Sequence, residues 1–104
     1  MKISIIMAFY NRQNLLDKTL ESIRKSSVKD YELIIIDDAS TVPLTCDEAK
    51  VIYVDKKDKW YTCSAVAFNR AMREATGDII IIQNPECYHV GDVLKYAVDN
   101  IKDN

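Results

Sequence analysis

Short apolar runs alternate along this chain with segments whose apolar residues recur at helical spacing. The runs are residues 3–9, 31–36, 51–54 and 79–82, and the last is four consecutive isoleucines. Runs of this length, rich in β-branched residues and apolar on both faces, are typical of strands covered on both sides of a sheet. Helical segments lie between or after these runs, so the predicted order of elements is β-α-β-β-α-β-α.

Capping and stop residues delimit the predicted helices. Asn11 is positioned to cap the first predicted helix, and Ser26–Ser27 are expected to end it. Thr62 or Ser64 would cap the second helix, and Gly77 would stop it. The predicted apolar faces are, in chain order, Leu15, Leu16, Leu20 and Ile23; Ala65, Phe68, Met72 and Ala75; and Val93, Leu94, Ala97, Val98 and Ile101.

Alternating strands and helices predict an α/β fold, with three layers (α/β/α) around a mostly parallel sheet joined by right-handed crossovers. A chain of 104 residues that is 48% apolar can bury one core, and with only 2 Gly and 2 Pro it contains no linker. We therefore expect a single domain over residues 1–104. In such sheets, ligands bind outside the carboxyl ends of the strands, where the strand order reverses.

Charge and cysteine content exclude several classes of protein. The formal net charge is -2, with 14 Lys and Arg against 16 Asp and Glu, so no basic surface for nucleic acid is expected. Cys46, Cys63 and Cys87 form neither a CxxC pair nor a zinc spacing, which fits a reducing cytoplasm without disulfides. No stretch approaches the roughly 20 apolar residues that span a bilayer, so no transmembrane segment is predicted.

Polar residues follow the first two predicted strands and are the first candidates for a site. Tyr10, which precedes Asn11 and Arg12, could lay its ring against a flat base or simply lie at the rim of the core. Asp37 and Asp38 follow the second run. An ionised carboxylate only accepts hydrogen bonds, so it suits an imide N–H or ribose hydroxyls, although an acidic pair is also ordinary in a strand-ending turn.

A second group of polar residues, Asn84 to His89, follows the fourth predicted strand. Glu86 could hold Mg²⁺ or Mn²⁺ against a diphosphate, because hard cations prefer oxygen ligands. His89 could join a softer divalent ion, donate to a phosphate oxygen or cap the last helix, and we favour the cap.

Basic residues elsewhere could also meet a diphosphate. Lys59 lies in a basic and aromatic loop, residues 55–61, that could close over phosphates or could simply be solvated. Asn69 and Arg70 lie inside the second predicted helix. Arg70 could reach a phosphate, or it could pair with Glu74 four residues further on.

Five stretches in a fixed order resemble family 2 glycosyltransferases. They are Ser4–Arg12, Leu20–Ile23, Tyr31–Ser40, Ala67–Ala71 and Ala75–Ile80, which together reach across essentially the whole chain. The resemblance implies the GT-A fold, a Rossmann-like α/β architecture, and the nucleotide-sugar-binding half of an inverting transferase. It also implies transfer of a sugar from a nucleotide-diphosphate donor to a glycan or other acceptor in polysaccharide or glycoconjugate synthesis.

The same resemblance implies roles for single residues. The loop at Ala8 to Tyr10 would cradle the nucleobase, Asp38 would accept a hydrogen bond from the base, and Asp37 would support the loop. Asn84-Pro85-Glu86 stands where the family has an Asp-x-Asp-like motif, so Glu86 would replace the metal-binding Asp in a site of lower charge. The expected donor site comprises Ala8, Phe9, Tyr10, Asn11, Arg12, Asp37, Asp38, Lys59, Asn69, Arg70, Asn84 and Glu86, with Glu86 and His89 as ligands of Mg²⁺ or Mn²⁺.

The resemblance further implies that these residues are a fragment. In this family the acceptor site and the catalytic base, typically a carboxylate, come from a segment after the donor-binding half. We therefore expect the base to lie outside these 104 residues, and no robust transfer by this chain alone. A homodimer through the uncovered edge of the last strand is a further expectation.

A non-catalytic module that binds a nucleotide or nucleotide sugar is an alternative that the sequence leaves open. A phospho-acceptor signalling domain is disfavoured, because such domains place their acidic pair after the first strand, where this chain has Tyr10 and Asn11. A sugar nucleotidyltransferase is disfavoured too, since the Gly-rich phosphate loop after the first strand is absent.

Overall fold

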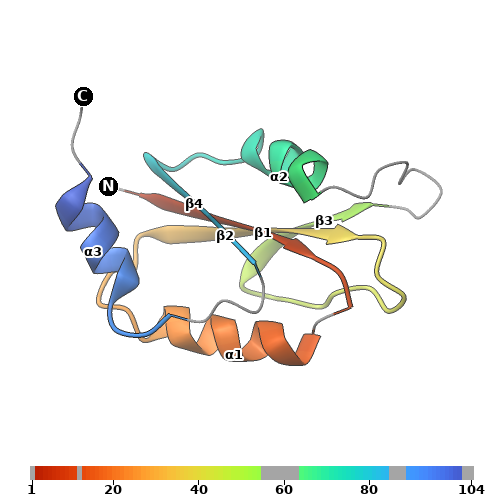
Figure 1. Cartoon of the computed structure of the whole chain (residues 1–104), viewed down its shortest axis with the longest axis horizontal. Helices are drawn as coiled ribbons and strands as arrows, with labels where there is room; N and C mark the ends of the chain where they lie inside the picture. The colour runs from red at the N-terminus through yellow and green to blue at the C-terminus, as the bar shows by residue number, and fades with distance from the viewer. Residues whose placement is uncertain (1, 12, 55–63, 85–88, 102–104) are drawn as a thin grey trace.

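Helices and strands follow one another in the predicted order (Figure 1). The computed structural model describes residues 2–11, 13–54, 64–84 and 89–101. Its elements are β1 (Ile3–Phe9), α1 (Gln13–Arg24), β2 (Tyr31–Asp38), β3 (Ala49–Val54), α2 (Ser64–Met72), β4 (Ile79–Gln83) and α3 (Val93–Asn100). The predicted β-α-β-β-α-β-α order is confirmed.

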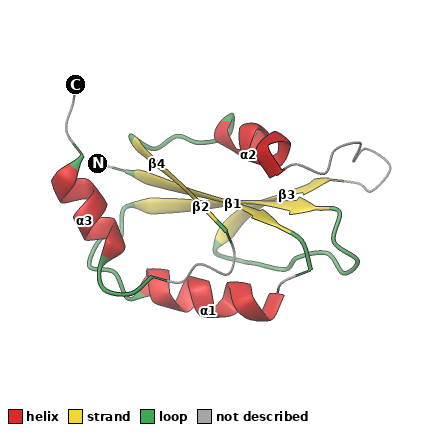
Figure 2. Ribbon diagram, in the orientation of Figure 1, coloured by secondary structure: helices red, strands yellow, loops and turns green. Residues whose placement is uncertain are grey.

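The strands form one parallel sheet between two helical layers. The strand order is β3-β2-β1-β4, and each neighbouring pair is parallel. Figure 2 shows α1 on one face of the sheet and α2 on the other, and Leu94 of α3 packs in the same buried cluster as α1. The predicted three-layer α/β/α architecture with a parallel sheet is therefore confirmed.

The strand order reverses at β1. From β1 the chain passes through α1 to β2 on one side, and from β3 it returns through α2 on the opposite face to β4, on the other side of β1. Such a reversal leaves a crevice outside the carboxyl ends of the two diverging strands. The ends of β1, β2 and β4 therefore define the region in which a ligand is expected.

Side chains alternate between the two faces of the sheet, as a two-residue period requires. On the α1 face the buried cluster consists of Ile3, Ile5, Met7, Phe9, Leu16, Leu20, Ile23, Leu33, Ile35, Leu44, Ile79 and Leu94. On the α2 face the cluster is smaller and consists of Ile6, Ile34, Ile36, Val54 and Ala71. Leu15, predicted to join the core face of α1, is exposed instead. Leu16, one residue on, fills the core position.

The isoleucine strand β4 is an edge strand rather than a strand covered on both faces. Ile79 is buried on the α1 face, whereas Ile80 and Ile82 are 42% and 50% exposed. The sequence run alone could not show this, because an apolar run does not reveal which face has a covering helix. The predicted homodimer through this edge stays a prediction.

Two predicted element ends are wrong. Strand β2 extends through Asp37 and Asp38, which pair in register with Tyr53 and Val54 of β3, so the acids end a strand rather than begin a turn. Backbone hydrogen bonds between strands can form whether or not the side chains are charged. Helix α2 ends at Met72, well before the predicted stop at Gly77.

Asn11 does not cap α1, contrary to prediction. The helix begins at Gln13, and the Asn11 carboxamide oxygen accepts a hydrogen bond from the backbone N of Thr41 at 2.8 Å. Asn11 has φ 53°, in the left-handed region that Asn tolerates better than most residues. Its polar side chain therefore joins two loops instead of starting a helix.

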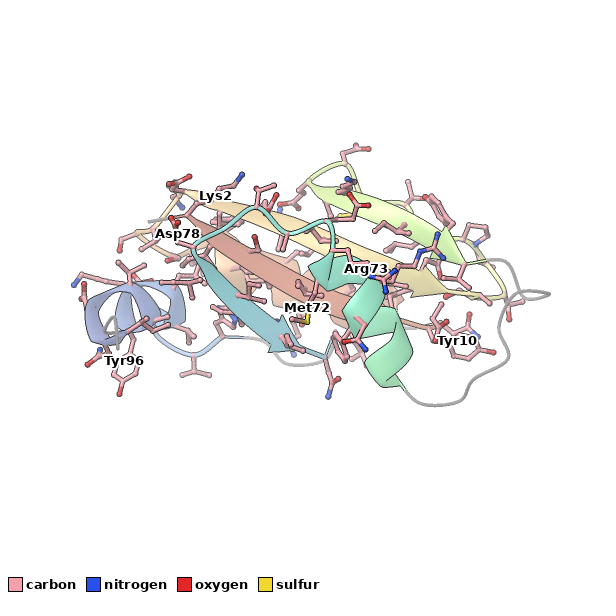
Figure 3. All side chains as sticks on the ribbon, turned by 90° about the horizontal axis from the view of Figure 1, so that it is seen from above. Lys2, Tyr10, Met72, Arg73, Asp78 and Tyr96 are labelled. Carbon is pink, nitrogen blue, oxygen red and sulfur yellow. The ribbon has the colours of Figure 1, made fainter. Side chains whose placement is uncertain are left out.

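A polar network closes the amino end of the sheet. The buried Ser4 hydroxyl donates to the Glu32 carboxylate and accepts from the backbone N of Gly77 at 2.8 Å. The Glu32 carboxylate also accepts from the backbone N of Thr76 at 2.7 Å. The backbone N of Lys2 donates to Asp78 at 3.1 Å, and Figure 3 shows these two residues together at this end. The network joins β1 and β2 to the connection between α2 and β4.

Candidate functional site

Tyr10 and Asp38 lie at the carboxyl ends of β1 and β2. Phe9 pairs in register with Asp37, so Tyr10 and Asp38 each follow directly on a paired position of two adjacent strands. The Tyr10 side chain is 50% exposed, whereas Asp38 is 8% exposed. Figure 3 shows Tyr10 at the end of the sheet opposite Lys2 and Asp78. The Tyr10 side chain is thus open to solvent and Asp38 is largely buried, while Phe9 is buried in the core.

Asp37 and Asp38 face opposite sides of the sheet, since neighbouring strand residues alternate. Asp37 faces the α1 side, where one carboxylate oxygen accepts from the backbone N of Leu44 at 2.7 Å and the other from the backbone N of Ser40 at 3.2 Å. Asp38 faces the α2 side, like Ile34 and Ile36 of the same strand. The two acids therefore have different surroundings.

The loop after β2 adopts a strained turn that Asp37 holds. Ala39 has φ 61°, a left-handed conformation that is uncommon for a residue with a Cβ. Its backbone N donates to the Asp37 carbonyl at 3.0 Å, and the Asp37 carboxylate binds the loop at Ser40 and Leu44. These bonds account for the persistence of the turn.

Hydrogen bonds join the loops after β1 and β2. The Asn11 backbone N donates to the Ser40 hydroxyl at 3.0 Å. The Asn11 carboxamide accepts from the backbone N of Thr41 at 2.8 Å and donates to the Thr41 hydroxyl at 3.3 Å. These hydrogen bonds, all made by Asn11, hold together the two loops that flank Tyr10 and Asp38.

The residues predicted on α2 are exposed. Asn69 and Arg70 lie in the second half of this helix, which packs over β1 and β2. The Glu74 carboxylate forms its ion pair with Lys50, at 2.5 Å. The hydrogen bond from Lys50, with a smaller contribution from the Arg70 charge, lowers the pKa of Glu74. Contact of Arg70 with a phosphate stays a prediction.

Several predicted site residues lie outside the described part of the chain. Arg12, Lys59 and Glu86 are among them. Asn84 is described: it is exposed and directly follows β4. The predicted roles of these residues in binding phosphate or metal stay predictions.

His89 contacts both β4 and α1. Its backbone N donates to the Ser22 hydroxyl at 2.8 Å, and its ring Nε2 lies 2.9 Å from the carboxamide oxygen of Gln83. The side chain is half-buried, and this burial lowers the pKa of His89, which favours the neutral ring. Sequence reasoning missed Ser22 and Gln83, since nothing in the sequence places Ser22 beside His89.

Asp92, not His89, caps α3, so the favoured interpretation of His89 is wrong. The Asp92 carboxylate accepts from the backbone N of Lys95 at 3.3 Å. It also accepts from the hydroxyls of Ser26 and Ser27, each at 2.5 Å, and these bonds hold the pKa of Asp92 well below its usual range. An Asp just before an apolar helical run is a cap signal that sequence reasoning could have used.

No group of three or more His, Cys, Asp or Glu side chains that could hold a metal ion is present among the described residues, which do not include Glu86. In the same part of the chain, no helix is long and apolar enough to span a bilayer. Cys46, a described cysteine, has a free, half-buried thiol.

The chain has a parallel sheet between two helical layers, and polar side chains lie at the strand ends beside a reversal of strand order. Doubly wound α/β proteins bind ligands in this arrangement. Comparison with known sequences identifies the family within this class of α/β proteins. The chain belongs to glycosyl transferase family 2, whose model matches residues 4–104. The predicted family is therefore confirmed.

Two relatives from Bacillus subtilis (strain 168) illustrate the membership. EpsE is 35% identical over 89 residues, which cover 80% of this chain and 32% of EpsE. YwdF, an uncharacterized glycosyltransferase, is 35% identical over 102 residues, which cover 93% of this chain and 37% of YwdF. The chain thus spans about a third of the length of either relative.

Solved structures share the fold. Residues 1–349 of TarS from S. aureus superpose with a TM-score of 0.76 at 20% identity, over 95% of this chain and 32% of that one. The mannosyltransferase PcManGT from Pyrobaculum calidifontis, solved with GDP-Man and Mn²⁺, superposes with a TM-score of 0.75 at 24% identity, over 98% of this chain and 32% of that one. The predicted GT-A fold is confirmed.

Proposed function

We propose that this chain binds the nucleotide of a nucleotide-diphosphate sugar at the carboxyl ends of β1, β2 and β4. It would be the donor-binding part of an inverting transferase that passes the sugar to a glycan or other acceptor in polysaccharide or glycoconjugate synthesis. The observation that carries the proposal is that the half-exposed Tyr10 and the largely buried Asp38 come at the carboxyl ends of two adjacent strands, in a chain of family 2.

The nucleobase would lie between the first two loops. Tyr10 offers an aromatic face, which contributes contact area without demanding a particular hydrogen-bond pattern. The Asp38 carboxylate would accept the base's ring N–H, and a charged acceptor makes such a bond stronger than a neutral one. Asp37 and Asn11 would act indirectly, because their side chains hold the loops that carry Ala8, Phe9 and Tyr10.

The diphosphate would lie toward β4. Asn84 and Glu86 supply carboxamide and carboxylate oxygens, which suit Mg²⁺ or Mn²⁺. PcManGT was solved with GDP-Man and Mn²⁺, and TarS with UDP-GlcNAc, which supports the same ligand class here. Arg12, Lys59, Asn69 and Arg70 would add positive charge and donors around the phosphates, and His89 Nδ1 would be the ring nitrogen open to a metal.

The acceptor site and the catalytic base would lie outside residues 1–104. Relatives about three times as long support this division, since this chain covers 32% of EpsE and 37% of YwdF. An odd number of cysteines, without a zinc spacing, supports a reducing compartment such as the cytoplasm. Alone, the chain would bind donor and transfer no sugar.

Calorimetric titration tests the proposal. The chain would be titrated with UDP, GDP and their sugars, with and without Mn²⁺, alongside Asp38→Ala and the matched control Asp30→Ala, at the residue that directly precedes the opposite end of the same strand. Asp38→Ala should weaken binding by at least about tenfold, because a hydrogen bond to a charged group contributes about 1.5–3 kcal/mol. Asp30→Ala should bind normally, and Glu86→Ala should remove the Mn²⁺ dependence.

Three results would contradict the proposal. One is no binding of any of these nucleotides at millimolar concentration by the unmodified chain. Another is equal loss in Asp38→Ala and Asp30→Ala, which would mean that the substitutions act on folding. The third is binding retained in Asp38→Ala, which would place the nucleotide elsewhere.

A further inference from the structure

The loop after β2, residues 39–44, is bound near both of its ends. Near its start, the Asn11 backbone N donates to the Ser40 hydroxyl at 3.0 Å, and the Asn11 carboxamide oxygen accepts from the backbone N of Thr41 at 2.8 Å. At its end, Leu44 is 1% exposed and belongs to the buried cluster on the α1 face. We call residues 39–44 the anchored loop.

Two neighbouring strands hold the backbone of Leu44. Its N–H donates to the Asp37 carboxylate at 2.7 Å, and its carbonyl accepts from the Tyr53 hydroxyl at 2.7 Å. Asp37 and Tyr53 are in-register partners of β2 and β3, and paired residues of a sheet point to the same face. Both side chains therefore reach Leu44 from the α1 side. With Asn11 after β1, they join the anchored loop to the ends of three adjacent strands.

The anchored loop adjoins both residues of the proposed base site. It begins directly after Asp38, and it binds Asn11, the residue after Tyr10. Asn11 and Ala39 have φ 53° and 61°, left-handed values that are uncommon in residues other than glycine. Such conformations persist only where surrounding contacts hold them. The bonds of the anchored loop supply these contacts, so the direction in which the chain leaves Tyr10 and Asp38 depends on them.

We propose that Asn11 and Tyr53 are positioning residues that hold the anchored loop and thereby set the affinity of the site for the nucleoside part of the donor. The inference rests on the proposed function, and it adds Tyr53, from a third strand, to the residues on which that affinity depends. Holding a binding loop in advance reduces the ordering cost that binding would otherwise impose. Both residues act through backbone groups, those of Thr41 and Leu44.

Two variants each remove one anchor. Asn11→Gly removes the carboxamide, and glycine adopts a φ of 53° without strain. Tyr53→Phe keeps the ring and removes only the hydroxyl that donates to Leu44. The matched controls, Asn100→Gly and Tyr96→Phe, lie on α3. The Asn100 carboxamide donates to a backbone carbonyl of its own helix, and Tyr96 is 70% exposed.

Calorimetric affinities for UMP and GMP measure binding of the nucleoside part without a diphosphate. Asn11→Gly should weaken binding by about tenfold and Tyr53→Phe by about threefold, the range expected for losing ordering hydrogen bonds. The double variant should lose about tenfold rather than about thirtyfold, because residues that act through one loop are not additive. Asn100→Gly and Tyr96→Phe should bind as the unmodified chain does.

Two further measurements separate positioning from a general effect on folding. Amide exchange should become faster at Thr41 in Asn11→Gly and at Leu44 in Tyr53→Phe, since each variant frees its own part of the loop. Gly91→Ala, which strains the backbone before α3, should lower the free energy of unfolding without changing nucleotide affinity. A residue with a merely structural role would behave as Gly91 does.

Three results would overturn the inference. If the unmodified chain binds neither monophosphates nor UDP or GDP, the proposed function fails and the inference fails with it. If it binds, and Asn11→Gly and Tyr53→Phe bind equally well, the positioning role alone is overturned. If the two losses multiply in the double variant, Asn11 and Tyr53 do not act through one loop, and the positioning role is again overturned.

Discussion

The two ends of the sheet use their polar side chains differently. At the amino end, Ser4, Glu32 and Thr76 bind one another and the backbone, and Gly77 lies in close contact with β1. At the carboxyl end, Asp37 binds loop backbone, while the Tyr10 ring remains half exposed. This difference indicates that the amino end stabilises the fold, whereas the carboxyl end supports loops that present side chains.

The largest expected effect is at the amino end. In Gly77→Ala the new Cβ would lie 2.6 Å from the Ser4 hydroxyl, 2.7 Å from the Ser4 backbone N and 2.9 Å from the Lys2 carbonyl. Relieving such contacts must move β1, so we expect a loss of about 3 kcal/mol in the free energy of unfolding. Urea denaturation measures it.

Gly91→Ala is the matched control for this substitution. Gly91 has φ +75° and nothing within 4 Å of a new Cβ, so only backbone strain of about 1 kcal/mol is expected. Equal losses in the two variants would show that the close contact at Gly77 contributes nothing to stability, and would contradict a stabilising role for the amino end of the sheet.

A smaller loss is expected for Asp37→Ala, which tests whether the carboxyl end also contains a structural residue. The substitution leaves the backbone N–H groups of Leu44 and Ser40 without their acceptor, and Leu44 is buried. We expect a loss of about 2 kcal/mol in the free energy of unfolding, with weaker nucleotide binding. Asp37→Asn keeps one acceptor oxygen and should lose about half as much. Unchanged stability in Asp37→Ala would contradict the support role.

The smallest effect concerns the pH dependence of stability. Burial opposes the charge of Glu32, but hydrogen bonds from Ser4 and Thr76 and the charge of Lys2 outweigh it and lower the pKa of Glu32 below 4.5. A lowered pKa in the folded state adds stability above the unfolded pKa, and this stability disappears as pH falls through the folded value. Stability should therefore fall at acidic pH.

Glu32→Gln should flatten this acid-side fall in the free energy of unfolding, measured by urea denaturation at a series of pH values. The control is Glu21→Gln, whose exposed carboxylate pairs with Lys25 at 3.7 Å on the helix surface. Identical slopes for the Glu32 and Glu21 variants would mean that the network at the amino end contributes no pH-dependent stability.

Much of the fold could be predicted because local patterns determine it. The bounds of β1 are the predicted ones, and the alternation of strands and helices fixes the layers. What could not be predicted depends on contacts between distant segments. Gly77 is typical of a helix end, yet a glycine is needed there because a Cβ would collide with Ser4. The exposure of Ile80 follows from the position of β4 at the sheet edge.

The positions of two candidate site residues could also be predicted from local patterns. Strand-end position placed Tyr10 and Asp38 correctly at one edge of the sheet. The sequence could not show that Asp37 faces Leu44, that Asn11 binds Thr41 or that His89 meets Ser22, since each partner comes from another part of the chain. The ligand-binding roles of these residues stay predictions.

The central claim is that ligand binds at the carboxyl end of the sheet and not at the amino end. The most direct test is to follow the backbone amide resonances of the chain by NMR during titration with UDP or GDP and Mn²⁺. The account predicts that shifts concentrate at Tyr10, Asn11 and Asp38, with Ser4, Gly77 and Asp78 unmoved. Shifts concentrated at the latter three, or no shift at any residue at saturating nucleotide, would contradict it.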